Sequence, residues 1–414
     1  MNIVRFITLC ILVASCRSVL AQQLEDYTPL QREKWLQEEQ PLKLKVYGGV
    51  SYDSNLFRLS DDADTQSAIG SSDRSDMIYQ LGAGGKYELR ASRQKFIAEA
   101  NVTEYKFQRF DDLDNTADDL RGEWQWEVGS NWNGDLGIGQ RRYLESFANF
   151  QQNVRDMVNQ NRLYGSANYL VYSRLKLTAA ADWVDTKHGV DSRNTLDSKT
   201  NTTTLEVNWI TPAENSVGLQ YRRADANFPN QAIIGPVVLD NSYTENEYSV
   251  VLRWRATGAS DVFARLGYTK RTFEQQQNRD YSAPTGRLTY RWTPTAKTAL
   301  EFTARRELAD FQGLTANYER ITGFSISPTW SVTPKVALRG TVSRDELEYL
   351  GNPGLASVAN DRKDTDYRYQ VSALWTPLRL TELTFNIENG HRTSNTALGD
   401  FKYNAGSVLL TRYF

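Results

Sequence analysis

Cysteine is almost absent from this chain of 414 residues, and the position of the few cysteines is informative. Only Cys10 and Cys16 occur, and both lie close to the first residue. A basic residue, an apolar stretch at 6–15 and small residues before Gln22 together predict a secretory signal peptide over residues 1–21. The exported chain would then have no disulfide, although export leads to an oxidising compartment.

The same segment admits a second interpretation. Val13-Ala14-Ser15-Cys16 resembles a lipobox, which would attach a lipid to Cys16. A membrane-embedded barrel needs no lipid anchor, so the signal peptide is the favoured interpretation. Residues 22–42 are then expected to form a periplasmic N-terminal segment. This segment is a solvated lead-in to the first strand or, as the less favoured interpretation, a docking helix for periplasmic export partners.

Long apolar runs are also missing. After residue 21 the sequence contains no stretch of the roughly 18 apolar residues that a transmembrane helix requires. The mean hydropathy of −0.57 would suit a soluble protein. A transmembrane β-barrel gives equally low values, because its lumen-facing residues dilute every window. A large soluble β-protein, such as a propeller or a sandwich, is the alternative.

Residues for catalysis are scarce. The two histidines, His188 and His391, are expected in outer loops without a paired nucleophile. The sequence has no metal-ligand spacing, no glycine-rich phosphate loop and no nucleophile elbow. The acidic run Asp61-Asp62-Ala63-Asp64 could hold a cation, but a flexible charged loop is the favoured interpretation. We therefore expect no enzyme activity, catalytic residue, metal, cofactor or nucleic-acid partner.

What the chain has in abundance is alternation of apolar and polar residues. In the tract 248–255, Tyr, Val, Leu and Trp occupy the even positions, and Ser and Arg occupy three of the odd ones. Similar tracts of about ten residues recur along the chain, as in outer-membrane barrel strands. The fold class is therefore predicted to be all-β, a transmembrane antiparallel up-and-down barrel over residues 43–414.

Turn residues divide this region into about eighteen strands, an even number as bacterial barrels require. The expected ranges are 43–52, 77–89, 94–105, 119–129, 134–143, 161–172, 174–184, 201–210, 215–223, 244–255, 260–271, 283–292, 297–306, 319–330, 335–344, 365–375, 379–389 and 400–414. Tight turns alternate with long loops, and the short side of such barrels faces the periplasm. Both termini are therefore expected to be periplasmic.

Four tight turns share a sequence signature. Trp209, Trp292, Trp330 and Trp375 each stand at a strand end shortly before Thr-Pro. Indole rings suit the headgroup layer, and proline ends a strand because it lacks a ladder donor. A soluble β-repeat could also place Trp beside a turn. Since all four fall on the predicted periplasmic side, we expect an interfacial girdle.

The opposite strand phase carries many charges. An Arg or Lys facing lipid near the bilayer centre costs about 2–4 kcal/mol, so these residues must face an aqueous lumen. The pore-lining candidates are Arg141, Arg222, Arg253, Arg265, Arg287, Arg291, Arg305, Arg339, Arg368, Glu123, Glu301 and Glu382. Arginine dominates the ninth to sixteenth strands, which suggests a positive stripe that guides solutes. Arg–Glu pairs that only brace the wall are the equally weighted alternative.

The last strand ends on Phe414, which resembles the terminal signal of chains handled by the outer-membrane assembly machinery. Arg412 departs from that pattern, because an aromatic or apolar residue is usual there. Phe401, Tyr403, Leu409 and Tyr413 share one phase and Phe414 the other. We therefore expect a bulge in this strand, or a phase assigned wrongly by one residue.

After the first strand comes the segment Tyr52, Asp53, Ser54, Asn55, Leu56, Phe57. This segment resembles the start of the EpsL-type outer-membrane proteins of exopolysaccharide loci, within the wider group of β-barrel porins. The resemblance implies a role in export or assembly of an extracellular polysaccharide beside an exosortase-associated system. Tyr47, Tyr143 and Tyr164 would offer weak contacts to a passing glycan.

Three functions remain open. The first is an outer-membrane pore for polysaccharide export through a polar, Arg-rich lumen, with the polymer as cargo and outer-membrane lipid around the wall. The second is a passive uptake porin for sugars or small anions. The third is a plugged barrel that acts as a structural or adhesive scaffold. All three place the protein in the Gram-negative outer membrane.

Overall fold

The computed structural model describes residues 41–414 except 149, 235–236, 276–278, 311–315, 317 and 351–360. The expected signal peptide and nearly all of the expected N-terminal segment lie outside the described residues. Among those that are described, no helix is long and apolar enough to cross a membrane.

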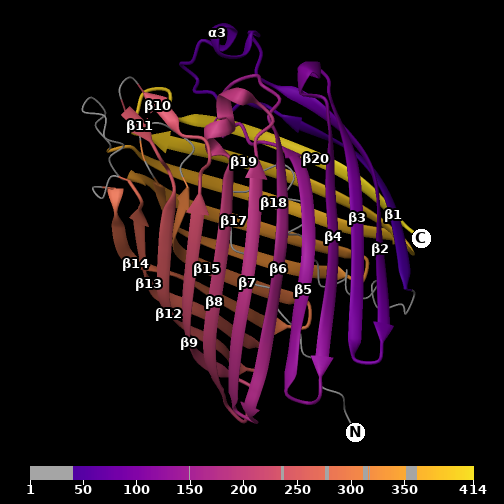
Figure 1. Ribbon diagram of the computed structural model, residues 1–414. Coiled ribbons are helices and arrows are strands. Elements are labelled where there is room, and N and C mark those ends of the chain that lie inside the picture. The colour runs from indigo at the N-terminus through magenta and orange to yellow at the C-terminus, as the bar shows by residue number, and fades with distance from the viewer. Residues whose placement is uncertain are drawn as a thin grey trace.

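Eighteen antiparallel strands form a single closed sheet (Figure 1), each paired with its neighbours in sequence. The last strand, β20, pairs with the first, β1, and closes the wall. The strands are β1 (Leu42–Asp53), β2 (Asp76–Ala91), β3 (Gln94–Phe107), β4 (Asn115–Val128), β5 (Trp132–Leu144), β6 (Met157–Tyr172), β7 (Leu175–Lys187), β8 (Ser198–Ile210), β9 (Ser216–Asn227), β12 (Tyr243–Thr257), β13 (Ser260–Phe273), β14 (Tyr281–Thr295), β15 (Thr298–Asp310), β16 (Tyr318–Thr333), β17 (Val336–Leu350), β18 (Lys363–Leu378), β19 (Thr381–Ser394) and β20 (Phe401–Tyr413). The predicted fold class is confirmed.

Every expected strand corresponds to one observed strand, and the main differences lie at the end that carries the long loops. There, β4 begins at Asn115 instead of residue 119, and β17 continues to Leu350 instead of residue 344. In these extensions the outer face carries polar side chains, Thr116 and Asp118 on β4 and Glu346 and Glu348 on β17, so a pattern of apolar residues on the outside does not mark them. Backbone pairing continues beyond the part of the wall that alternation reveals.

Tight turns and longer connections alternate around the barrel and lie at opposite ends (Figure 1). The short side includes 92–93, 173–174, 258–259 and 296–297. The long side carries the only small elements between strands that the described residues contain: helix α3 (Thr65–Ile69), 3-10 helices η1 (Asp111–Leu113) and η2 (Asp191–Leu196), and the hairpin of β10 (Ala232–Ile234) and β11 (Val237–Leu239). Sequence reasoning treated all of these segments as plain loops.

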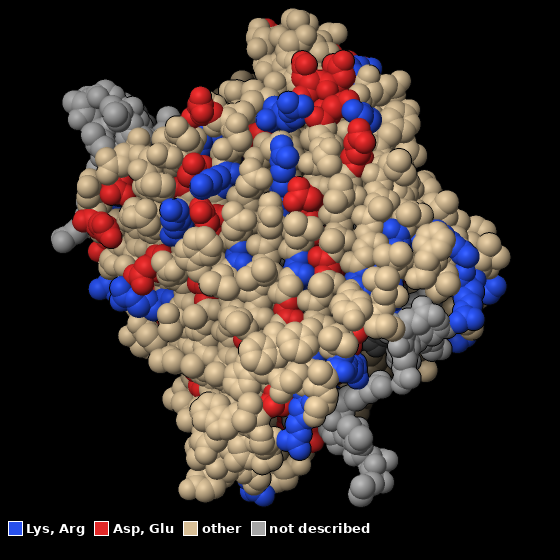
Figure 2. Space-filling view, turned by 45° about the vertical axis from the view of Figure 1, so that its right-hand side comes forward, with Lys and Arg blue, Asp and Glu red and all other residues tan. Residues whose placement is uncertain are grey.

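Side-chain exposure alternates along the strands and separates an outer from an inner face. On β1, Leu42, Leu44 and Val46 are exposed on the outside, while Lys43 and Lys45 are less exposed on the inside. Figure 2 shows broad uncharged areas on one face, with acidic and basic side chains gathered toward the end that carries the loops. An apolar belt of this kind is what a bilayer requires of a barrel wall.

The closing strand corrects one expectation. Register along β20 runs without a shift against both β1 and β19, so the expected bulge is wrong. Tyr403 and Leu409 are buried on the inner face, and Val408 and Leu410 are exposed on the outer face. Phe414 continues the outer phase and exchanges backbone hydrogen bonds with Leu44 of 2.8 and 3.3 Å. The aromatic phase of this strand lines the lumen.

Candidate channel lining and mouth

The inner face is built from the strand phase opposite the apolar belt. The arginines and glutamates expected to line a pore all occupy this phase, as their strand positions and contacts show. Most of them are partly or fully buried by their neighbours, and Glu123 and Glu382 are buried. The side chains therefore lie along the wall.

Acidic partners accompany nearly all of the predicted arginines. The pairs are Arg141–Asp119 at 3.5 Å, Arg222–Glu245 at 2.8 Å, Arg253–Glu206 at 2.9 Å, Arg265–Glu247 at 3.4 Å, Arg287–Glu307 at 2.8 Å, Arg305–Asp345 at 2.9 Å, Arg339–Glu301 at 4.0 Å and Arg368–Glu388 at 3.6 Å. Glu123 pairs with Arg121, and Glu382 accepts from the Tyr413 hydroxyl at 3.1 Å. Within the described part of the chain, only Arg291 among these arginines has no carboxylate within ion-pair distance.

Three of the arginines form a row across adjacent strands. Arg265, Arg287 and Arg305 stand directly opposite one another in the registers of β13, β14 and β15. Like charges in that arrangement repel. Glu307 lies between the first two, with its carboxylate 3.8 Å from Arg265 and 2.8 Å from Arg287.

The third arginine of the row obtains its carboxylate from two strands away. Asp345 on β17 reaches Arg305 on β15 by crossing β16 at Gly323. A Cβ atom at Gly323 would overlap the Asp345 carboxylate, so only glycine permits this crossing. The arginine row, hereafter the Arg265–Arg287–Arg305 row, is thus neutralised by acids of the same wall, and the expected positive stripe is largely compensated.

Two of the three tyrosines suggested as glycan contacts, Tyr47 and Tyr164, lie flat against the wall. The Tyr164 hydroxyl donates to Glu123 at 2.5 Å, and its ring covers Gly137, where a Cβ would fall 2.3 Å from the ring. Tyr47 covers Gly82 in the same way and shares a 2.6 Å hydrogen bond with Thr103. Aromatic rings packed over cross-strand glycines stabilise sheets. Their rings therefore brace the wall.

The segment that carries the family resemblance is a buried anchor for the first long loop. Asp53, Asn55, Phe57 and Arg58 are almost fully buried at the top of β1. Asn55 donates to the carbonyl oxygens of Leu59 and of residue 402 at 2.8 and 2.9 Å. These contacts fix the loop to β20 and give the motif a structural role.

Arg58 ties that loop to the inner wall. Its guanidinium lies 2.8 Å from the Asp53 carboxylate and 3.6 Å from the centre of the Tyr403 ring. Its backbone has φ 57°, a left-handed conformation that costs a non-glycine residue about 1–2 kcal/mol. The ion pair and the cation–π contact offset this cost, so loop 1 (54–75) is held over the mouth.

An aromatic cluster joins three loops above the wall. Phe57 from loop 1 packs against Phe110 and Phe147, each with ring centres 4.7 Å apart. Ile78 and Phe107, from the inner face of β2 and β3, complete the buried cluster. These three loops therefore share a hydrophobic core of their own.

A polar clasp joins the β5–β6 loop to the β7–β8 loop. His188 Nδ1 lies 2.7 Å and Arg193 Nε 2.9 Å from the Asp156 carboxylate, which also accepts from the Gly189 N–H at 2.8 Å. Burial opposes ionisation of Asp156, but the bonds from His188 and Gly189 and the charge of Arg193 outweigh it and lower its pKa. His188 lies in a loop, as expected, but its side chain is buried, with 3% of its surface exposed.

The other histidine also differs from expectation. His391 lies within β19, not in a loop, and stacks on Tyr367 with ring centres 4.8 Å apart. Its strand phase faces outward, near the loop end of the wall. Sequence alternation could have shown this, because Asn389-Gly390-His391 continues the period of the preceding apolar residues.

The acidic residues of loop 1 make their contacts within the loop itself. Asp61 pairs with Arg74 at 2.6 Å, and Asp64 caps α3 by accepting from Ser67. The bonds from Ser67 lower the pKa of Asp64. Within the described residues, no group of three or more His, Cys, Asp or Glu is arranged to hold a metal ion.

Tryptophans mark the turn end of the outer face. Trp209, Trp292, Trp330 and Trp375 are all exposed there. Trp132, stacked on Tyr169 at 4.4 Å, and Trp254 are also exposed at this end and extend the row beyond the Thr-Pro turns. Neither Trp132 nor Trp254 is followed by Thr-Pro, so the sequence signature does not mark them.

No family model matches the chain, and no curated protein matches it in sequence. Solved structures with the same fold include the outer-membrane protein OpdK of Pseudomonas aeruginosa, with a TM-score of 0.50 and 9% identity over 90% of this chain and 99% of that one. The structure of OpdK with vanillate gives the same TM-score and identity over 90% and 98%. A BenF-like porin of Pseudomonas fluorescens Pf-5 gives 0.50 and 8% over 91% and 99%.

These likenesses concern the fold. They agree with the eighteen-strand barrel and with the expected location in the Gram-negative outer membrane. Neither these structures nor any family model supports the specific exopolysaccharide family.

Proposed function

We propose that this chain forms an outer-membrane channel for the passive uptake of small polar solutes, either sugars or small anions. The observation that carries the proposal is the closed eighteen-strand wall with an apolar outer belt and an inner face of charged and hydrogen-bonding side chains. Barrels of this size enclose an aqueous lumen unless loops fill it.

The lining favours weak, repeated contacts over one strong site. Conduction requires that solutes bind well enough to enter and loosely enough to leave. Here most lumen carboxylates and guanidinium groups already have a partner on the wall, such as Arg222 with Glu245. Arg291, near the turn end of β14, is the exposed exception and the residue we assign to anion contact.

The pore-lining and girdle roles belong to the same proposal. The predicted inner-face residues would set the charge that solutes meet, and the four turn-end tryptophans would seat the wall in the headgroup layer. Both termini would then be periplasmic, since the turn end holds Leu42 and Phe414. The N-terminal leader would direct export.

Planar bilayers test the channel directly. The purified full chain should give discrete open steps of conductance, and liposomes containing it should take up radiolabelled glucose or vanillate faster than empty liposomes. OpdK, which shares the fold, has been seen with vanillate, which makes that carboxylate a suitable first anion. A protein that is folded, as judged by heat-modifiable migration on gels, yet gives no steps would instead be a plugged scaffold.

Polysaccharide export, implied by the Tyr52–Phe57 motif, is the second candidate. Asp53, Asn55, Leu56 and Phe57 of that motif are buried where loop 1 leaves β1, which favours a structural role for the motif over contact with a polymer. A clean deletion strain separates the two functions. Uptake predicts slower growth on the solute with unchanged surface polymer, whereas export predicts polymer trapped in the periplasm.

A further inference from the structure

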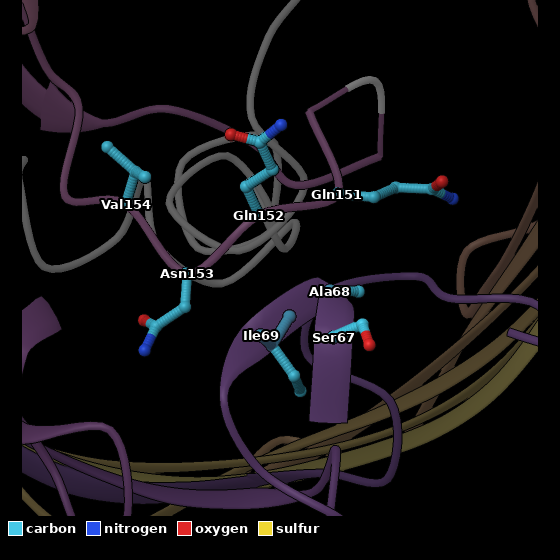
Figure 3. A pocket seen from close by; sticks show the side chains of 7 residues that line it. All are labelled: Ser67, Ala68, Ile69, Gln151, Gln152, Asn153 and Val154. Carbon is cyan, nitrogen blue, oxygen red and sulfur yellow. The ribbon is translucent and has the colours of Figure 1, made fainter. Parts of the chain in front are cut away.

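A cavity lies at the mouth, between helix α3 of loop 1 and the loop that joins β5 to β6. Its volume is about 480 Å³, within the roughly 300–1,000 Å³ typical of small-molecule sites. Figure 3 shows the two sides: Ser67, Ala68 and Ile69 from α3, and residues 151–154 from the opposite loop. Neither side contributes a charged residue.

Asn153 is the residue that points to a ligand. In Figure 3 its side chain leaves the loop on the side opposite to those of Gln152 and Val154. Its Oδ1 atom is buried and has no hydrogen-bond partner among the described residues. A buried amide oxygen without a donor is unfavourable, so a hydroxyl group placed in the cavity would satisfy it.

The other walls suit a molecule with both polar and apolar faces. Amides donate and accept hydrogen bonds at once, as hydroxyl groups do. Ala68, Ile69 and Val154 supply an apolar surface beside the polar one. An anion would find no positive charge here, while a sugar presents hydroxyl groups at its edges and C–H groups on its ring faces.

The cavity also contacts the residues that anchor loop 1. Gln151, in its wall, donates a hydrogen bond to the backbone carbonyl of Arg58. Ile69, on its other wall, belongs to the aromatic cluster around Phe57. Both walls are therefore attached to the anchored residues of loop 1.

We propose that this cavity binds neutral sugars at the channel mouth, with Asn153 as the central polar contact. The inference deepens the proposed uptake function by naming its solute class. Binding does not depend on conduction, so the two ideas can fail separately.

The test is a titration of the purified full chain, in detergent, with methyl α-glucoside and with maltose, followed by saturation-transfer NMR. Sodium glucuronate serves as the charged comparison. The wild type should bind both neutral sugars and bind glucuronate more weakly. Asn153→Leu should weaken sugar binding about tenfold, the effect of losing one or two hydrogen bonds.

A second variant tests the wall of the cavity that α3 forms. Ala68→Glu adds bulk and charge on α3 and should also abolish neutral sugar binding. Gln108→Ala, which removes an exposed loop amide outside the cavity, should bind like the wild type. Heat-modifiable migration and unchanged step conductance verify that each variant is folded.

The outcomes are distinct. A wild type that binds neither sugar, or an Asn153→Leu variant that binds them as well as the wild type, overturns the sugar site even if the channel conducts. A protein that binds sugar without conducting overturns the uptake function and leaves the site standing.

Discussion

Arg58 joins three parts of the molecule through one guanidinium group. It pairs with Asp53 at the top of β1, stacks on Tyr403 of β20 and holds loop 1 between them. Both charged side chains are almost fully buried. Removing one partner of such a pair leaves the other without compensation, which costs more than the net value of the intact pair.

We expect Arg58→Ala to release loop 1 and to destabilise the mouth by about 3–5 kcal/mol. Limited proteolysis should then cut within 54–75, where the wild type resists, and single-channel traces should become noisier. Arg90→Ala is the matched control, because Arg90 pairs with Glu88 at an exposed turn. Equal protection of loop 1 in wild type and Arg58→Ala would show that the guanidinium does not anchor it.

The Asp156 clasp should respond to acid. Its carboxyl has a lowered pKa in the folded protein, so its contribution to stability is present above the unfolded value of about 3.9 and is lost as the pH falls through the lower folded value. Hydrogen exchange of the segments 145–148, 150–156 and 188–197 should therefore stay slow at neutral and mildly acid pH and accelerate below about pH 4. Asp156→Asn should exchange fast already at neutral pH. Acceleration already at mildly acid pH in the wild type would show that the Asp156 carboxyl does not control the opening of these loops.

At the scale of strands, the register of neighbouring strands places glycines opposite aromatic rings, and the wall depends on this packing. Gly137 on β5 lies opposite Tyr164 on β6, and the ring fills the space that a side chain would need. The glycine thus lets Tyr164 lie flat and reach Glu123 on β4. The same neighbouring strands have an outward glycine, Gly122, whose added Cβ would meet Ile138 at an ordinary 3.5 Å.

Gly137→Ala should push Tyr164 off the wall and into the lumen. We expect a loss of about 1–3 kcal/mol in stability, as overpacking typically costs, together with a smaller step conductance. Gly122→Ala should change neither. Conductance in bilayers and the temperature of the heat-modifiable gel shift measure the two effects, and an unchanged step size in Gly137→Ala would mean that Tyr164 finds another place against the wall.

Strand positions were predictable because alternation is a local property of the chain. Each of the eighteen strands is found where the period of two predicts it, and most of the tight turns carry Pro, Gly or Asn. Local patterns could not show that Arg265 and Arg287 stand opposite each other or that Asp345 crosses Gly323, since both depend on register between strands. They also missed the loop elements, because α3 and η2 are too short for a helical period. The burial of Arg58 depends on its contact with Tyr403, which is far from it in sequence.

At the scale of the whole molecule, the balance of charge around the lumen decides what passes. The Arg265–Arg287–Arg305 row would form a positive band across three strands if Glu307 and Asp345 did not neutralise it. Field focusing in a narrow lumen makes such a balance matter more than in open water. The wild-type channel is therefore expected to discriminate only weakly between small anions and cations.

Removing the acids that neutralise the Arg265–Arg287–Arg305 row should make the channel anion-selective. In the double variant Glu307→Gln with Asp345→Asn, the amides keep the side-chain volume while two negative charges disappear beside three arginines. The reversal potential in a potassium chloride gradient should shift toward the chloride value, and more strongly at low ionic strength, where the screening length is longer. Glu346→Gln removes a carboxylate from the same strand as Asp345, but on the outer face beside Arg344, and should leave the reversal potential unchanged. If the control shifts the potential as far as the double variant does, selectivity is set by the net charge of the barrel and not by the lining of its lumen.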